Sequence, residues 1–201
     1  MANLFGNRGA PVPERQILKN RYATARHMLI LVAVLTALNV FLTATNSDSY
    51  FLFSASLPII LTVEGMFYCG KLPEDFYTGE FAGMEFLDES VFFVLAAISV
   101  AIAVSYFVLW ILSAKGRGVW LLVSLILFSL DTLLMFGYYG IDLSMLTDII
   151  IHVIVIIFLV SGVIAHHKLK DLPDEEFFVM AAEEMAAQSE ADTEGDVNDI
   201  K

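Results

Sequence analysis

Three ionisable side chains lie inside long apolar stretches, and they are the residues of this chain best placed to do chemistry. Asp131 lies within the run VWLLVSLILFSLDTLLMF, while Asp148 and His152 lie at the start of a later apolar run. A charged side chain inside a bilayer is costly unless it faces protein or water, so each of these groups requires a partner. An acid beside an imidazole can share a proton, hold an ion or join two helices.

Helix geometry places these groups at similar depths. A rise of 1.5 Å per residue puts Asp131 about 20 Å from the inner edge of an outward-running helix, and His152 about 24 Å from that edge on an inward-running one. Asp148 and His152 are four residues apart and share a helix face. Asn39, on an earlier apolar run, lies about 17 Å from the inner edge. We therefore predict a polar cluster of these four residues, with Asp131 and His152 within reach of a hydrogen bond or one water and Asp148 nearer the outer surface.

Two interpretations of the cluster stay open. It is either a proton or ion site, or polar pocket, that opens to the outside, or a hydrogen-bonded clamp between helices. For a clamp, Asp131→Asn is expected to keep most hydrogen bonds. A metal site is a weaker alternative because one His and two carboxylates lack a tight spacing signature, so we expect no metal and no cofactor. No nucleophile with an adjacent base is visible, so no catalytic residue is assigned and no enzyme is expected.

Composition places the chain among membrane proteins. Of its 201 residues, 58% are hydrophobic and only 17% are charged. The net charge of −12 comes largely from residues 171–201, which hold eleven acidic residues and one basic residue. Clustered Lys and Arg, which neutralise phosphates, are missing, so nucleic acid is excluded as a partner. Cys69 is the single cysteine and rules out an internal disulfide. The first apolar run starts near Met28 without a cleavage pattern, so no cleavable signal peptide is expected.

The pattern predicts an all-α polytopic membrane protein, a bundle of four transmembrane helices embedded in the lipid bilayer. About 20 mainly apolar residues are needed to cross a bilayer. Residues 45–90 carry eight acids and one base, Lys71, whereas basic residues flank the opposite ends of the runs. The positive-inside rule therefore places residues 45–90 outside and both termini in the cytoplasm, as in a multi-pass protein of the plasma membrane. The predicted spans are residues 28–44, 91–112, 119–138 and 148–165.

Residues 45–90 are predicted to form an outer cap. Within it, residues 50–63 are apolar but would give a helix of only roughly 21 Å, interrupted by Pro58, which is too short to span. We expect a re-entrant or interfacial segment here. A five-span alternative stays open, although it would move the cationic loop near Lys115 to the outside, against the positive-inside rule.

The two ends of the chain differ in charge. Residues 1–27 are basic and predict a cytoplasmic segment that lies on the membrane surface. Residues 166–201 predict a cytoplasmic acidic tail that starts with a short helix, whose weakly apolar side (residues 177–185) could dock to a partner, and ends disordered. Within the spans, Ala97, Ala101 and Ser105 form a ladder of small residues, which favours close helix packing.

Three strings resemble those of small, uncharacterised four-span integral membrane proteins of Gram-positive bacteria: NSDSYFLFSAS (46–56), LFSLDTL (127–133) and GVIAHHKL (162–169). The resemblance covers residues 20–175 and carries no activity. From the residues we expect a non-enzymatic accessory or assembly subunit of a membrane complex, with a membrane-protein partner or further copies of itself. The alternative is a small-solute or ion and proton transport protein that uses the buried cluster.

Overall fold

The computed structural model describes residues 14–47, 49–114, 116–140 and 145–172. These ranges contain five α-helices and two short 3₁₀ turns, and no strand is present within them. Four of the helices are long and apolar enough to cross a membrane, which confirms the predicted all-α, four-span bundle and indicates a multi-pass membrane protein. The elements are α1 (Glu14–Ala44), α2 (Leu57–Tyr68), η1 (Glu74–Tyr77), η2 (Gly79–Phe81), α3 (Glu89–Leu112), α4 (Gly118–Tyr139) and α5 (Leu146–Asp171).

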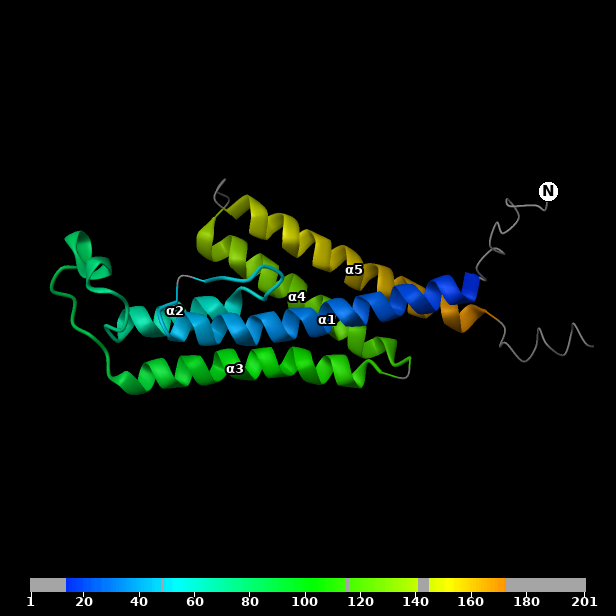
Figure 1. Ribbon diagram of the computed structural model, residues 1–201, viewed down its shortest axis with the longest axis horizontal. Helices are drawn as coiled ribbons and strands as arrows, with labels where there is room; N and C mark the ends of the chain where they lie inside the picture. Colours follow the sequence, from blue (N-terminus) through cyan, green and yellow to red (C-terminus); the bar gives the residue numbers. More distant parts are fainter. Residues whose placement is uncertain (1–13, 48, 115, 141–144, 173–201) are drawn as a thin grey trace, which may run out of the picture.

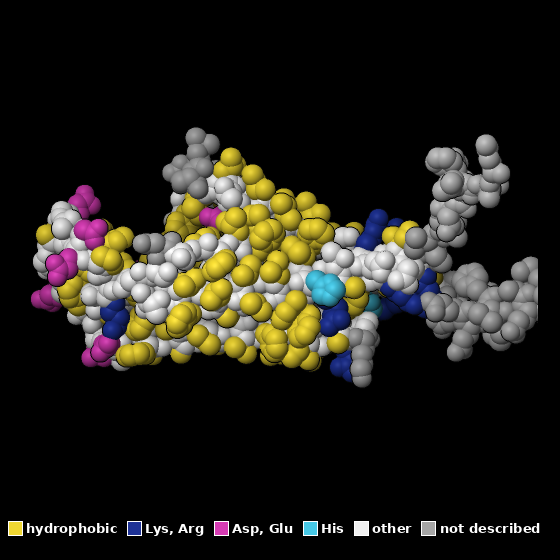
Figure 2. Space-filling view, viewed as in Figure 1, with side chains coloured by type: hydrophobic (Ala, Val, Ile, Leu, Met, Phe, Trp, Pro, Cys, Tyr) yellow, Lys and Arg dark blue, Asp and Glu magenta, His cyan; other side chains and the backbone are white. Residues whose placement is uncertain are grey.

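The four long helices form an elongated bundle in which α1 packs against both α3 and α5, and α4 packs against α5 (Figure 1). The start of α1 and the end of α5 lie at one end of the bundle, which we call the basic end, while α2 and the cap lie at the other. Figure 2 shows hydrophobic side chains along the middle, Asp and Glu at the cap, and Lys and Arg at the basic end. This distribution is typical of a protein with an apolar belt between two aqueous faces.

The bounds of α3 and α4 agree with the predicted spans within two residues, but those of α1 do not. Helix α1 begins at Glu14, so residues 14–27 extend the first span instead of forming a separate surface segment. The physical reason is an apolar stripe that continues below the span: Leu18, Tyr22 and Ala25 recur every three or four residues and are buried. Helix α5 likewise continues to Asp171.

Polar contacts at the basic end explain why this extension of α1 is retained. The last carbonyl groups of a helix lack partners within it, and a nearby cation is favourable there. The Tyr22 hydroxyl donates to the Ser113 carbonyl at 2.6 Å, and Arg26 donates to Ser113 Oγ at 3.1 Å and to the Trp110 carbonyl at 3.3 Å. The basic segment of α1 therefore closes the C-terminal end of α3.

The packing face of α3 differs from the predicted one. Ser99, Ala103 and Tyr106 are buried against the bundle, whereas Ala97 and Ala101 are exposed and Ser105 is only partly buried. Residues two apart on a helix point about 200° apart, so the predicted ladder lies on the opposite side. Its assignment to packing within this bundle is therefore corrected.

Helix α2 belongs to a re-entrant segment. From the end of α1 the chain runs back along the bundle and then turns, and α2 returns toward the cap (Figure 1). Its 12 residues span about 18 Å, well short of a bilayer, so α2 is not a fifth span. Pro58 lies in the first turn of α2 and does not break it, because a proline there loses no helical hydrogen bond.

The C-terminal end of α2 is closed by the cap. The Tyr77 hydroxyl accepts the Leu72 N–H at 3.1 Å and lies 3.1 Å from the Phe67 carbonyl, where it can donate. The Tyr77 ring also packs against Phe67 and Phe86, with ring centroids 5.8 and 4.9 Å apart. Aromatic side chains of the cap thus fix the C-terminal end of α2, leaving its N-terminal end to be held by the long helices.

Candidate functional site: the buried end of the re-entrant segment

The carboxylate of Asp131, on α4, binds the N-terminal end of α2. Its Oδ2 accepts the Ser56 N–H at 2.9 Å and its Oδ1 accepts the Leu57 N–H at 2.8 Å. The first N–H groups of a helix have no partner within the helix and carry partial positive charge. Asp131 is only 3% exposed. It therefore supplies the anion that a helix beginning inside the bundle requires.

His152, on α5, lies against the same carboxylate. Its Nε2 is 3.5 Å from Asp131 Oδ2 and 3.2 Å from Ser56 Oγ. Its Nδ1 is 2.8 Å from the Asp148 carbonyl, which can only accept, so Nδ1 must carry a hydrogen. The ring is 2% exposed and stacks on Phe128 with centroids 5.1 Å apart. These contacts fix the orientation of the imidazole.

Two polar side chains of α1 hold the extended chain that leads to α2. Asn39 accepts the Phe51 N–H at 2.9 Å and donates to the Phe51 carbonyl at 2.7 Å and to Ser54 Oγ at 2.8 Å. The Thr36 hydroxyl accepts the Ala55 N–H at 2.8 Å. An irregular backbone inside a membrane domain needs partners for its polar groups, and these contacts provide them.

The structure thus brings together some, but not all, of the predicted cluster. Asp131 and His152 lie side by side, as expected from their depths. Asp148 contributes its carbonyl to His152, while its side chain is partly exposed. Asn39 binds the preceding loop and makes no hydrogen bond with the other three among the described residues. Ser56, which joins both halves of the arrangement, was not predicted; the signal that could have identified it is a serine just before Leu57-Pro58, a common helix start.

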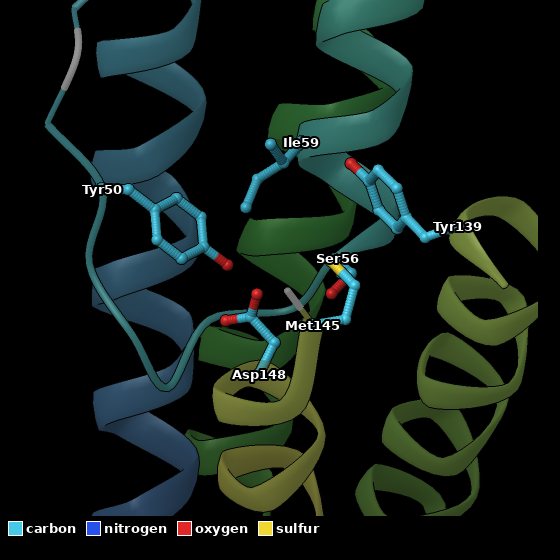
Figure 3. Close-up of a pocket in the computed structure, with 6 residues that line it drawn as sticks. All are labelled: Tyr50, Ser56, Ile59, Tyr139, Met145 and Asp148. Carbon is cyan, nitrogen blue, oxygen red and sulfur yellow. The ribbon is translucent and has the colours of Figure 1, made fainter. Parts of the chain in front are cut away.

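Two cavities border this arrangement. The outer cavity, about 290 Å³, is lined by residues from the loop, α2, α4 and α5: Tyr50, Ser56, Ile59, Tyr139, Met145 and Asp148 (Figure 3). A second cavity, about 240 Å³, is mainly apolar and is lined by residues of α3 and α4 and by Leu57 of α2; the lining residues with polar side chains are Ser105, Tyr106 and Asp131. Asp131 therefore lines the second cavity, while Ser56, whose N–H it binds, lines the outer one.

Two ionisable groups outside the long helices show the local electrostatics. Burial raises the pKa of the Tyr50 hydroxyl, so this group stays neutral at physiological pH and can both donate and accept. Hydrogen bonding from Ser90 lowers the pKa of Asp88, whose carboxylate caps the start of α3 by accepting the Ser90 N–H at 2.9 Å. Within the described residues, no group of three or more His, Cys, Asp or Glu side chains is placed to hold a metal ion.

The Ser56 and His152 pair raises the question of nucleophilic catalysis, since a hydroxyl 3.2 Å from an imidazole resembles an activated serine. Acyl transfer also needs free N–H donors for a developing oxyanion. The N–H groups beside this serine, those of Ser56 and Leu57, are both bound to Asp131. The arrangement is therefore better suited to holding the backbone than to stabilising a tetrahedral intermediate.

Comparison of the chain with protein-family models, with curated proteins and with solved structures found no match.

Proposed function

We propose that this chain is a non-enzymatic component of a membrane complex, an accessory or assembly subunit, in which Asp131 and His152 lock the re-entrant segment so that α2 and the cap form a fixed outer surface. The observation that carries this proposal is that both carboxylate oxygens of Asp131 bind the N-terminal N–H groups of α2. A hydrogen bond to a charged group contributes about 1.5–3 kcal/mol. Two such bonds are enough to hold a short helix in place.

The hydrogen bonds made by the buried polar atoms of Asp131 and His152 support a structural role over a catalytic one. Among the described residues, no buried side-chain nitrogen or oxygen of Asp131, His152 or Ser56 lacks a hydrogen-bond partner. A catalytic group normally keeps an atom available for its substrate, whereas every buried polar atom of Asp131 and His152 has a protein partner. Such saturation is what a clamp requires.

For the orientation, we propose that both termini are cytoplasmic and that the cap faces outward. Described basic residues gather at the basic end, whereas Lys71 is the one Lys or Arg of the described cap, and positive charge favours the cytoplasmic side. The test is thiol labelling of intact cells after replacing Cys69 by Ser. A cysteine at Glu80 should react with an impermeant reagent and one at Lys115 should not; external labelling at Lys115 would contradict the orientation.

The assembly role is tested by the size of the complex in native membranes. The full chain, a chain lacking residues 171–201 and Asp131→Leu are each solubilised gently and compared on a native gel. The truncated tail includes residues 173–201, which lie outside the described residues. An assembly subunit is expected to migrate in a discrete complex that truncation or loss of the clamp disrupts. Migration of all three as free monomers would refute the role.

A second candidate function is the handling of a small solute, an ion or a proton. The outer cavity favours it, because this cavity reaches Ser56 and Asp148, which both contact His152. Intramembrane ionisable groups next to a cavity often mark such pathways. Flux measured in liposomes tests it: Asp131→Asn should abolish transport by the purified protein, and equal flux in liposomes with and without protein would exclude it.

A further inference from the structure

We infer that the outer cavity is a binding site for a small primary ammonium compound, with Asp148 as its counter-ion. This inference names a solute class for the second candidate function, but equilibrium binding requires neither transport nor assembly. The cavity is lined by six residues, four of which carry a side-chain oxygen: Tyr50, Ser56, Tyr139 and Asp148.

Three of these oxygen-bearing side chains, those of Tyr50, Ser56 and Asp148, come from different parts of the chain and meet at one space. In Figure 3 the Tyr50 hydroxyl and the Asp148 carboxylate point toward one another, with Ser56 beside them. A primary ammonium group carries three N–H donors and no acceptor. The Ser56 hydroxyl has two acceptor lone pairs, so at least one is left for a ligand whichever group donates in its contact with His152. A carboxylate and two hydroxyl oxygens therefore match the hydrogen-bonding capacity of one –NH₃⁺ group.

The carboxylate of Asp148 is the charged group of the cavity. The Asp148 side chain is partly buried, and its carboxylate makes no hydrogen bond or ion pair with any residue that the structure describes. Its place in the first turn of α5 makes the negative charge tolerable, because that end of the helix is partly positive. Yet the carboxylate is turned toward the cavity, where a cation would complete its contacts.

The remaining walls and the size of the cavity restrict the ligand. Ile59, Met145 and the ring of Tyr139 supply apolar surface that suits a short alkyl or aryl group. A volume of about 290 Å³ lies at the lower limit of small-molecule pockets, which are usually about 300–1,000 Å³. The occupant is therefore a small amine and not a large drug-like cation.

The surface charge around the cap supports a cationic ligand. Acidic side chains gather at this end of the molecule (Figure 2), among them Glu74, Asp75, Glu80 and Glu85, which are exposed. A surface of one charge sign raises the local concentration of ions of the opposite sign and speeds their association. Amines would thus be enriched at the cap end of the molecule, the end toward which α2 returns.

The experiment is a ligand-observed NMR titration of the full-length protein in nanodiscs with n-propylammonium at neutral pH and constant ionic strength. The neutral isostere 1-propanol, tetramethylammonium and sodium are the comparison ligands. We expect n-propylammonium to bind saturably. Binding of 1-propanol, which has no charge, and of tetramethylammonium, which has no N–H donors, should be at least about tenfold weaker. Sodium at equal concentration should not displace n-propylammonium. Tighter binding of tetramethylammonium, equal binding of 1-propanol or displacement by sodium would overturn the ligand class.

Matched variants locate the site. Asp148→Asn keeps the backbone carbonyl that holds His152, and we expect it to weaken binding by about tenfold or more; Tyr50→Phe, which removes one oxygen, should weaken it by about threefold or more. Glu80→Gln removes an exposed acid of the cap and should leave the affinity within about twofold, because exposed charges are screened. Unchanged affinity in both Asp148→Asn and Tyr50→Phe, or an equal loss in Glu80→Gln, would overturn the site. If Asp148→Asn does not fold, Tyr50→Phe alone decides. Failure of binding leaves the gel and stability tests of the assembly role unaffected.

Discussion

Replacement of Asp131 by Asn tests the clamp at its most demanding point. Both oxygens of the carboxylate accept backbone N–H groups, from Ser56 and Leu57. An amide has a single acceptor oxygen, so its –NH₂ group must face the other N–H, donor against donor. The variant therefore loses one charge-assisted hydrogen bond, about 1.5–3 kcal/mol, and strands a buried N–H. We expect Asp131→Asn to lower the free energy of unfolding by about 3 kcal/mol. Asp131→Leu leaves both buried N–H groups without an acceptor and should lower it by about 5 kcal/mol.

This expected loss of stability in Asp131→Asn differs from the expectation drawn from the sequence, in which Asn keeps most of the hydrogen bonds of Asp131. The measurement is unfolding in mixed micelles followed by the fluorescence of Trp110 and Trp120. Thr132→Val is the matched control, because the Thr132 hydroxyl donates only to the Phe128 carbonyl of its own helix, and its loss should cost less than about 1.5 kcal/mol. A free energy of unfolding for Asp131→Asn equal to that of the parent would refute the reasoning.

Three further predictions follow from other contacts. Asn39→Ala removes three hydrogen bonds to the loop and should cost about 2–4 kcal/mol in the same unfolding assay, with faster amide exchange at residues 51–55. Gly162→Ala would place a methyl group against Ala25 and 2.8 Å from a methyl of Leu121, and should lower stability by about 1–3 kcal/mol, whereas Gly137→Ala, with open space around it, should be neutral or stabilising. The folded-state pKa of Asp88 lies below its ordinary value of 3.8. The stabilisation that the Asp88 carboxylate provides is therefore complete above pH 3.8 and is lost as the pH falls through the folded-state pKa. In acid titrations followed by circular dichroism, the part of the acid-dependent loss that comes from Asp88 should be absent from Asp88→Asn, because asparagine still caps the helix but carries no charge.

The long spans were predictable because they depend on local composition. The second and third runs are mainly apolar along their whole length, and the hairpin between them is bounded by Trp110 and Trp120, so their limits agree with α3 and α4 within two residues. The start of α1 was not, because residues 14–27 are rich in charge. The stripe of Leu18, Tyr22 and Ala25 indicates a helix there, but contacts with neighbouring helices, such as that of Arg26 with the end of α3, show that it is continuous with the span.

The re-entrant segment was predictable in kind but not in position. Its length and Pro58 excluded a span, yet nothing in the sequence reveals how deep the chain enters before α2 begins. That depth depends on the long-range pairing of Asp131 with backbone groups 74 and 75 residues away. The rise of 1.5 Å per residue correctly predicted that Asp131 and His152 are neighbours, because it gives the position of each residue along the bundle axis. It did not predict that Asn39 binds Phe51 and Ser54 and not the other three residues, because it gives no information on the direction in which a side chain points.

The central claim, that Asp131 holds the N-terminal end of α2 inside the bundle, is tested most directly by amide hydrogen exchange at Ser56 and Leu57. In the parent protein these two N–H groups should exchange as slowly as the interior of α2. In Asp131→Leu they should exchange at least about tenfold faster, since each tenfold corresponds to about 1.4 kcal/mol of protection, while α3 stays unchanged. Exchange in the parent as fast as in the exposed residues 74–82, or equal exchange in parent and variant, would contradict the account.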